Sequence, residues 1–201
     1  NDNDGDLDLF ITNDKGMKFY YVNTGSGDFI KKYDEIVTAN FGNAMGIAIA
    51  DYDKNGKPDA YVSTHSGQKN KLFCNQLPNN HHFINVKLVG TNSNKSAIGA
   101  AIKVKSNGLW QLRQILPVQG IGSQNSTRQH FGLGMSTTID SIEIRWPSGY
   151  IQKLGPVVVD QFLTITEENA LQLSGFAFDD KNANCIWDES EPKVENVKFK
   201  L

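Results

Sequence analysis

The sequence contains little that would cross-link it or anchor it in a membrane. Its 201 residues include two cysteines, Cys74 and Cys185, which are too few for a disulfide framework, so a single pair and two free thiols are both open. The longest uninterrupted apolar run, residues 44–50, is far too short to span a bilayer. The formal net charge of −2 gives no general attraction to nucleic acid or to anionic membranes. A hydrophobic content of 39% is typical of an ordinary globular protein.

The sequence also lacks the motifs of common catalytic sites. There is no Gly-x-Ser-x-Gly elbow, no P-loop and no dinucleotide-binding glycine pattern. The histidines His65, His81, His82 and His130 have no cysteine or histidine partners at zinc-binding spacing. We expect His130 to be a hydrogen-bonded structural residue. No segment keeps a helical period over three turns, so short strands are the expected secondary structure.

What the sequence does contain is an acidic loop at residues 51–59. Side-chain oxygens stand at its first, third, fifth and ninth positions, and Gly56 follows the fifth. Several oxygens that converge through a sharp turn suit Ca²⁺, whereas Mg²⁺ prefers to keep its water ligands. Without a cation, the carboxylates of Asp51, Asp53 and Asp59 would repel one another. The loop therefore predicts a calcium site.

The same pattern occurs at the start of the sequence. Aligning Gly5 with Gly56 gives an offset of 56 − 5 = 51 residues, which suits a four-stranded blade or a similar β-unit. The alignment places Asp2, Asp4 and Asp8 on Asp53, Asn55 and Asp59. The counterpart of Asp51 would precede the first residue, so we expect the sequence to be part of a longer chain. In both copies a strand-like run and then an aromatic strand follow the loop, and the aromatic strand ends in Asn23 or Asn75.

Residues 50–59 resemble the FG-GAP or VCBS repeat, the calcium-loop blade unit of integrin-like β-propellers, and residues 1–9 resemble the same motif without its first position. In that family, positions one, three, five and nine supply side-chain oxygens and position seven supplies a backbone carbonyl. The resemblance implies that the Ca²⁺ ligands are Asp51, Asp53, Asn55, Lys57 and Asp59 in one loop and Asp2, Asp4, Asp6 and Asp8 in the other. It also implies that residues 1–80 form partial propeller blades with an exposed open edge.

Residues 81–168 are predicted to form many short strands. Residues 83–89 alternate between apolar and polar side chains, which is the period of a half-buried strand. Asn107-Gly108 lies between two further alternating runs, a strong hairpin signal. Residues 140–146 alternate again and stop at a Pro-Ser-Gly turn, which places Trp146 in the expected core. Many short strands separated by turns indicate a β-sandwich or barrel.

Five short motifs mark the same region. They are Asn92-Ser93-Asn94, Ala97-Ile98-Gly99-Ala100, Gln119-Gly120-Ile121-Gly122-Ser123-Gln124, His130-Phe131-Gly132-Leu133-Gly134 and Arg145-Trp146-Pro147-Ser148-Gly149. Their order resembles that of the ASPIC/UnbV domain, which commonly follows FG-GAP/VCBS repeats in other proteins. The two resemblances together imply an all-β chain, in which partial FG-GAP/VCBS propeller blades precede a β-sandwich or barrel-like ASPIC/UnbV domain.

The last segment, residues 169–201, carries a looser acidic loop. Residues 175–192 resemble the opening of the B-type repeats of bacterial surface proteins, which predicts the start of an Ig-like domain. The spacing of the oxygens also matches a helix-flanked calcium loop. The candidate ligands are Asp180, Asn182, Asn184, Ile186, Asp188 and Glu191. Cys185 stands where such a loop has glycine, and its Cβ would strain the turn.

These features together predict a non-enzymatic, calcium-stabilised adhesion or binding module that is secreted or held at the cell surface. Its expected partner is a protein or a carbohydrate, with no nucleic acid and no membrane span. The alternative is an accessory carbohydrate-binding part of a secreted polysaccharide hydrolase, in which an exposed Trp110 stacks on sugar. A glycosidase needs two facing carboxylates, whereas Asp140 and Glu143 would lie on opposite faces of an alternating strand.

Overall fold

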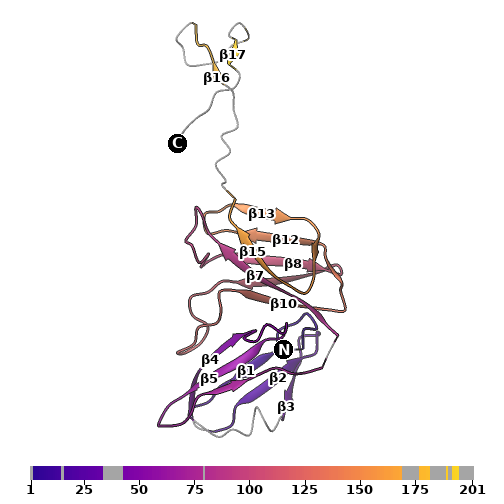
Figure 1. Ribbon diagram of the computed structural model, residues 1–201, viewed down its shortest axis with the longest axis vertical. Helices are drawn as coiled ribbons and strands as arrows, with labels where there is room; N and C mark the ends of the chain where they lie inside the picture. Colours follow the sequence, from indigo (N-terminus) through magenta and orange to yellow (C-terminus); the bar gives the residue numbers. More distant parts are fainter. Residues whose placement is uncertain are drawn as a thin grey trace. The chain divides into compact units, whose positions relative to one another are not determined.

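The protein is built from β-strands (Figure 1). The computed structural model describes residues 2–14, 16–33, 43–78, 80–168, 177–181, 189 and 192–194. These residues contain no α-helix, and none of their sheets closes on itself, which confirms the predicted all-β fold. Nor do they include a helix with the length and hydrophobicity that a bilayer crossing requires. The chain divides into two compact units, Asn1–Glu168 and Asn169–Leu201.

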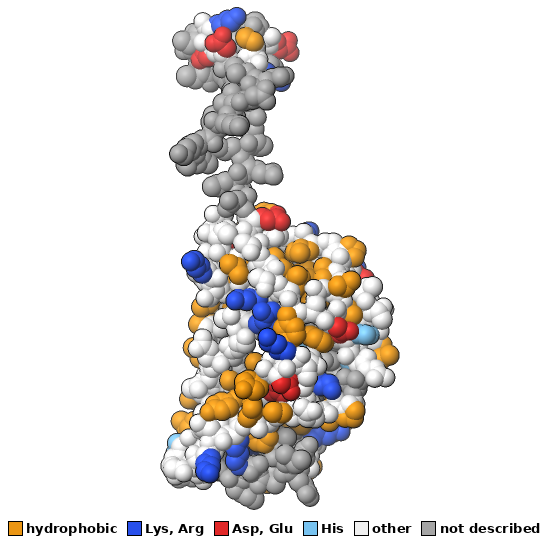
Figure 2. All heavy atoms as spheres, viewed as in Figure 1, with side chains coloured by type: hydrophobic (Ala, Val, Ile, Leu, Met, Phe, Trp, Pro, Cys, Tyr) orange, Lys and Arg blue, Asp and Glu red, His pale blue; other side chains and the backbone are white. Residues whose placement is uncertain are grey.

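The first half of the larger unit consists of two antiparallel three-stranded sheets. They are β1 (Leu9–Ile11), β2 (Phe19–Asn23) and β3 (Phe29–Lys32), and β4 (Ala44–Ala50), β5 (Asp59–Thr64) and β6 (Lys71–Phe73), each in chain order. The ring centroids of Phe10 and Phe73 lie 6.5 Å apart, so the two sheets are in contact. Hydrophobic side chains gather on the surface over β4 and β5 (Figure 2). One acidic loop precedes β1, and the other joins β4 to β5.

The second half of the larger unit is a β-sandwich. Its strands are β7 (His82–Val89), β8 (Ala101–Ser106), β9 (Leu109–Gln114), β10 (Gln129–Gly134), β11 (Thr138–Ile139), β12 (Ser141–Arg145), β13 (Ile151–Leu154), β14 (Val157–Val158) and β15 (Gln161–Thr166). They form sheets of order β10-β7-β15, β13-β12-β8-β9 and β11-β14. β7 pairs antiparallel with β10 but parallel with β15.

The core lies between the two larger sheets of the sandwich. Its buried side chains alternate along the strands, as the period of two requires. They are Ile84, Val86, Leu88, Ala97, Ala100, Ile102, Val104, Ile115, Phe131, Leu133, Ile139, Ile142, Ile144, Trp146 and Ile165. Trp146 is 1% exposed, as predicted, and its Nε1 donates a hydrogen bond to Gln152 Oε1 at 2.9 Å. This bond satisfies the polar edge of a side chain that is otherwise packed in apolar surroundings.

The smaller unit is described only around one strand pair. β16 (Ala177–Phe178) pairs antiparallel with β17 (Lys193–Val194), and the Asp179 N–H donates to the Pro192 carbonyl at 3.1 Å. The acidic loop of the tail lies between these two strands, so strands rather than helices flank it. Residues 195–201, the end of the segment that is predicted to start an Ig-like domain, lie outside the described residues.

The sandwich covers the free edge of β4. The Ile47 N–H donates to Ser123 Oγ at 2.9 Å, and the Ile49 N–H donates to Asn125 Oδ1 at 2.8 Å. Side chains of the loop before β10 thus take the place of a neighbouring strand, and they satisfy donors that an edge strand otherwise exposes.

Glycine makes this close approach possible. A Cβ on Gly46 would lie 2.3 Å from the carbonyl oxygen of Gly122, a distance that backbone atoms cannot tolerate. Gly122 itself has a φ of 62°, in the left-handed region that glycine adopts without strain. The bend at residues 120–122 is therefore a part of the sandwich that packs directly against β4.

We predict that Gly46→Ala destabilises the protein by about 1–3 kcal/mol, the usual result of forcing extra volume into a packed contact. Gly155→Ala is the matched control, because a Cβ at Gly155 meets no atom within 4 Å. Urea unfolding of both variants and of the wild type measures the difference. Equal effects of the two substitutions would contradict the close contact between β4 and the Gly122 carbonyl.

Glu167 holds a loop of the sandwich through five hydrogen bonds. The side chain is 2% exposed, and its Oε2 accepts the N–H groups of Thr91 (2.9 Å), Asn92 (3.0 Å) and Ser93 (2.7 Å). Its Oε1 accepts the hydroxyls of Ser93 (2.9 Å) and Ser148 (2.6 Å). Burial alone would raise the pKa of this carboxyl, but the hydrogen bonds outweigh burial and lower the pKa to about 2.

This lowered pKa predicts a specific pH dependence. Because the folded protein holds Glu167 ionised more strongly than the unfolded chain does, its contribution to stability is full above about pH 4.5 and declines as the pH falls towards 2. At pH 7 we expect Glu167→Gln to be less stable by about 2 kcal/mol, typical of hydrogen bonds to a charged group. The difference in unfolding free energy between the wild type and Glu167→Gln, followed from about pH 2.5 to about pH 7, measures this gap. A gap that does not narrow in acid would refute this role.

Candidate metal centre

The loop between β4 and β5 folds as it does because two residues take left-handed backbone conformations. Lys54 has a φ of 60° and Gly56 a φ of 84°. At Gly56 a side chain is excluded for a second reason, since a Cβ there would lie 2.3 Å from the ring of Phe83 in the sandwich. The glycine that the sequence placed after the fifth position is thus required both by the turn and by its contact with β7.

Three predicted ligands of this loop come together. Carboxylate oxygens of Asp51, Asp53 and Asp59 all lie within 4.8 Å of one another. Asp59 is 2% exposed and accepts the N–H groups of Tyr52 (2.8 Å) and Asn75 (2.7 Å), so its orientation is set by the backbone. No second group of this kind occurs among the residues that the structure describes.

Asp51 has an oxygen without a hydrogen-bond partner. Its Oδ2 accepts the Gly56 N–H at 3.0 Å and Asn85 Nδ2 at 3.4 Å, whereas its Oδ1 is buried and has no partner. A buried acceptor without a donor costs free energy, and a cation removes that cost. The donor set consists of hard oxygens, which fits Ca²⁺.

The electrostatics of Asp51 point the same way. Burial raises the pKa of its carboxyl, the charges of Asp59 and Asp53 raise it further, and the Gly56 N–H opposes the shift. Without a counter-charge the ionised form is therefore disfavoured. A divalent cation among the three carboxylates would reverse this balance.

Hydrogen bonds within the loop orient the residues at its fifth and seventh positions, Asn55 and Lys57. The Asn55 N–H donates to Asp53 Oδ1 at 3.1 Å, and the Lys57 N–H donates to Asn55 Oδ1 at 2.8 Å. Lys57 Nζ donates to the Leu77 carbonyl at 2.5 Å, which directs the ammonium group to the segment after β6. Asn55 and the Lys57 carbonyl stay predicted ligands, beside the three carboxylates that lie together.

The first acidic loop repeats these hydrogen bonds. The Asp4 N–H donates to Asp2 Oδ1 at 3.4 Å, and the Asp6 N–H donates to Asp4 Oδ1 at 3.2 Å. Asn3 has a φ of 63° and Gly5 a φ of 111°, so both are positive, as in their counterparts Lys54 and Gly56. The two loops therefore share a backbone conformation, even though the carboxylates of the first loop do not gather as those of the second do.

Asp6 differs from its counterpart Lys57 in a way that matters for a cation. Its Oδ1 is buried without a hydrogen-bond partner. Burial raises the pKa of the Asp6 carboxyl, and the charges of Asp4, Asp8 and Asp2 raise it further. The first loop thus also holds a carboxylate whose ionised form needs a counter-charge.

Two asparagines close the loops, and sequence reasoning assigned them no role. The Asn23 N–H donates to Asp8 Oδ1 at 3.0 Å, as the Asn75 N–H does to Asp59 Oδ1. Their side-chain amides then donate to the carbonyls of Leu7 (3.4 Å) and Pro58 (3.2 Å). The signal was present, because an asparagine ends the aromatic strand in both copies of the repeat.

Asn3 joins the two loops to the sandwich. It is 6% exposed, its Nδ2 donates to the Gly56 carbonyl at 2.8 Å, and its Oδ1 lies 2.7 Å from His130 Nε2. The Gly134 N–H donates to the Asn3 carbonyl at 2.7 Å. This bridge spans 127 residues of sequence, and no local pattern could have indicated it.

His130 is a structural residue, as expected. Burial lowers its pKa to about 3, and the charge of Arg113 contributes, so the ring is neutral at pH 7. Because the side-chain Oδ1 of Asn3 can only accept, the neutral ring donates to it from Nε2. The ring stacks on Phe83, with 5.8 Å between the centroids and 9° between the planes.

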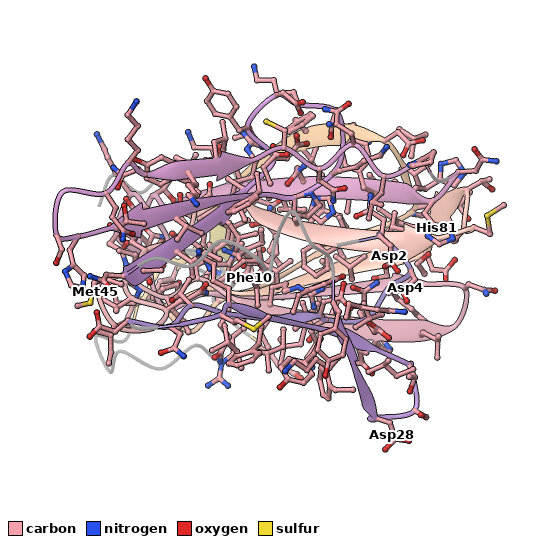
Figure 3. All side chains as sticks on the ribbon, turned by 90° about the horizontal axis from the view of Figure 1, so that it is seen from below. Asp2, Asp4, Phe10, Asp28, Met45 and His81 are labelled. Carbon is pink, nitrogen blue, oxygen red and sulfur yellow. The ribbon has the colours of Figure 1, made fainter. Side chains whose placement is uncertain are left out.

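His81 also contacts the first loop, because its Nδ1 lies 2.7 Å from the Asp2 carbonyl oxygen. Figure 3 shows Asp2, Asp4 and His81 at one end of the unit.

The remaining predicted residues are less fully described. Asp180 of the tail is half-buried. Five other candidate ligands lie outside the described residues: Asn182, Asn184, Ile186, Asp188 and Glu191. Cys74 is an exposed free thiol, and Cys185 lies outside the described residues.

Comparisons with known families match both halves of the larger unit. The model of the FG-GAP-like repeat matches residues 2–62, and the model named ASPIC and UnbV matches residues 90–172. A comparison with curated proteins gave no match. The family matches confirm the two resemblances seen in the sequence. The B-type repeat of the tail stays a prediction, because neither match extends past residue 172.

We predict that Asn3→Ala lowers stability by about 1–3 kcal/mol, because it leaves the buried Gly56 carbonyl without its donor and His130 Nε2 without its acceptor. Asn92→Ala is the control, since the Asn92 side chain is exposed and only its backbone N–H takes part in a described hydrogen bond. Chemical denaturation compares the two variants. A loss no larger than that of the control would show that Asn3 does not tie the loops to the sandwich.

Proposed function

Because the chain carries an FG-GAP-like repeat followed by an ASPIC and UnbV domain, we propose that it is a calcium-stabilised, non-enzymatic binding or adhesion module of the cell exterior. FG-GAP repeats are typical of extracellular and cell-surface proteins, and both domain types are generally non-catalytic. FG-GAP domains suggest protein ligands, so a protein rather than a carbohydrate is the proposed partner.

The observation that carries the calcium proposal is the buried Oδ1 of Asp51. It has no hydrogen-bond partner, and it belongs to the group in which oxygens of Asp51, Asp53 and Asp59 lie within 4.8 Å of one another. Proposed ligands are these three carboxylates with Asn55 and the Lys57 carbonyl. The first loop, with Asp2, Asp4, Asp6 and Asp8, is proposed as a second site.

Calcium would act here as a structural ion. Extracellular modules hold Ca²⁺ with dissociation constants of about 10⁻⁴ to 10⁻³ M, which suffices because the ion is abundant outside cells. At about 10 mM Ca²⁺ and a dissociation constant of about 1 mM, binding to the folded state alone adds about 1.4 kcal/mol. The loops contact the sandwich through Asn3 and Gly56, so the added stability would extend to the surface between the two halves.

The absence of catalysis is proposed on the placement of the acids. Asp8, Asp51 and Asp59 are engaged in the loops, and Glu167 is bound by five donors. Glu143 lies between Lys103 (3.6 Å) and Lys153 (3.4 Å) on the outer face of its sheet. These environments leave the acids as structural or surface groups rather than a facing pair across a cleft.

We predict that Ca²⁺ raises the melting temperature and that a chelator lowers it, whereas Asp51→Asn removes this response. In the presence of chelator, Asp51→Asn should be as stable as the wild type or more stable, since it relieves a buried charge whose pKa burial raises. A loss of stability that Asp51→Asn causes only when Ca²⁺ is present distinguishes a metal ligand from a purely structural residue.

Asp140→Asn is the matched control, because Asp140 is an exposed carboxylate of the sandwich. Its response to Ca²⁺ should equal that of the wild type. Thermal unfolding in about 10 mM CaCl₂, in MgCl₂ and in EDTA, with isothermal titration of Ca²⁺, measures these effects. A wild-type melting temperature that is the same in Ca²⁺ and in EDTA would overturn the calcium proposal.

A further inference from the structure

One edge of the sandwich is open. In the sheet of order β13-β12-β8-β9, the last strand, β9, pairs with β8, and no strand of the described residues pairs with its other side. Three of its side chains are apolar and at least half exposed: Leu109 at 73%, Trp110 at 50% and Leu112 at 50%. An uncovered apolar edge strand is a surface on which another strand can pair.

The register of the β8–β9 hairpin defines which backbone groups face outward. The turn Asn107-Gly108 has positive φ values of 50° and 78°, as a two-residue hairpin loop requires, so Ser106 and Leu109 form a hydrogen-bonded pair. Hydrogen-bonded and non-hydrogen-bonded pairs then alternate. The Ile115 N–H donates to the Ala100 carbonyl at 2.9 Å, which agrees with this alternation at the far end.

Trp110, Leu112 and Gln114 are accordingly the residues whose N–H and C=O groups point away from β8. Among the described residues, none of their N–H groups takes part in a hydrogen bond outside the hairpin. The Leu112 carbonyl accepts Arg113 Nη1 at 3.0 Å and keeps a second lone pair. Three uncharged residues thus present outward-facing backbone groups at alternate positions along β9.

The opposite edge of the same sheet is protected in the usual ways. β13 is four residues long, carries Lys153 on its outer face, and ends before Gly155-Pro156. A charge and a proline are standard defences against pairing at an edge. β9 is six residues long and has no proline, and its outward-pairing residues carry no charge. The contrast within one sheet marks β9 as the edge that is suited to pairing.

We propose that β9 pairs with β9 of a second copy of this chain, antiparallel and about a two-fold axis at Leu112. In this register Leu112 lies opposite its own copy, and Trp110 lies opposite Gln114 of the second copy. Arg113 lies opposite Gln111, so no like charges meet. The strand is therefore complementary to itself in side chains and in backbone groups, which is the requirement for a two-fold interface.

The lysines on the outer face of the sheet are compatible with this dimer and make its stability depend on salt. Lys103 and Lys105 of β8 lie beside Leu112 and Trp110, and Lys105 Nζ lies 6.0 Å from the centre of the Trp110 ring. In the dimer the two β8 strands would be about 14 Å apart, three strand spacings of about 4.8 Å. Repulsion across that distance is largely screened at physiological ionic strength. Salt should therefore strengthen self-association.

Cysteine cross-linking tests the register. The background is the full chain with Cys74→Ser and Cys185→Ser. Residues of a hydrogen-bonded pair have Cα atoms about 5.5 Å apart, within the range that a disulfide bridges. We expect Leu112→Cys alone to give covalent dimers under a mild oxidant. Trp110→Cys mixed with Gln114→Cys should also cross-link, whereas Gln114→Cys alone should not.

Sedimentation velocity over a range of protein concentrations tests the association itself. Leu112→Lys places two like charges opposite each other and should weaken dimerisation at least tenfold, by about 1.4 kcal/mol. Ile151→Lys is the matched control, because Ile151 is 51% exposed on the outer face at the protected edge and should leave dimerisation unchanged.

Three results would overturn the proposal. One is a wild-type chain that stays monomeric at all concentrations, together with a Leu112→Cys variant that gives no cross-link. Another is a dimer that Leu112→Lys leaves intact, which would place the interface elsewhere. The third is self-association that salt weakens, since this would mean that acidic groups of the second copy meet the lysines of β8 instead of its β9 strand.

Discussion

Carboxylates that are partly withdrawn from water are the constraint on which much of this structure depends. The two acidic loops pack against the sandwich, and Asp6 and Asp51 each hold a buried oxygen without a donor. The contact is close, because a Cβ on Gly132 would lie 2.5 Å from the Cα of Asn3 and one on Gly56 would meet Phe83. Seating the loops therefore raises the free energy of their charged form, and a cation is the natural compensation.

Carboxylates of the same loop have different tasks. Asp59 and its counterpart Asp8 accept backbone N–H groups and so fix the loop to the following strands. Asp51 keeps one oxygen without a donor, and its pKa is raised. Once the loop is folded, the carboxylates of one proposed ligand set are thus no longer equivalent: Asp59 is fixed by two backbone donors, whereas Asp51 keeps one oxygen without a donor. This difference comes from hydrogen bonding and burial, not from the spacing of the acids in the sequence.

The sequence predicted local features well and distant contacts poorly. The strands β7 and β12 match the predicted alternating runs 83–89 and 140–146 to within one residue at each end, because alternation is a property of neighbouring residues. The Asn107-Gly108 turn, equally local, joins β8 to β9 as predicted. The oxygen spacing of the loop at residues 51–59 likewise indicated three carboxylates that lie together. The Asn3–His130 bridge and the cover of β4 by Ser123 were not predicted, since they join residues 127 and 76 positions apart. No pattern within a window of sequence reports such pairs.

The parallel pairing of β7 with β15 has a consequence for the order of events during synthesis. β7, the first strand of the sandwich, lies between β10 and β15, the latter of which starts at Gln161. Contacts between segments this distant form slowly, because a long loop must close before they add stability. β7 can pair with β10 once residues 129–134 have left the ribosome, but its other edge stays unpaired until nearly all of the larger unit has been made. Over that interval the nascent chain exposes a strand edge of the kind that favours aggregation.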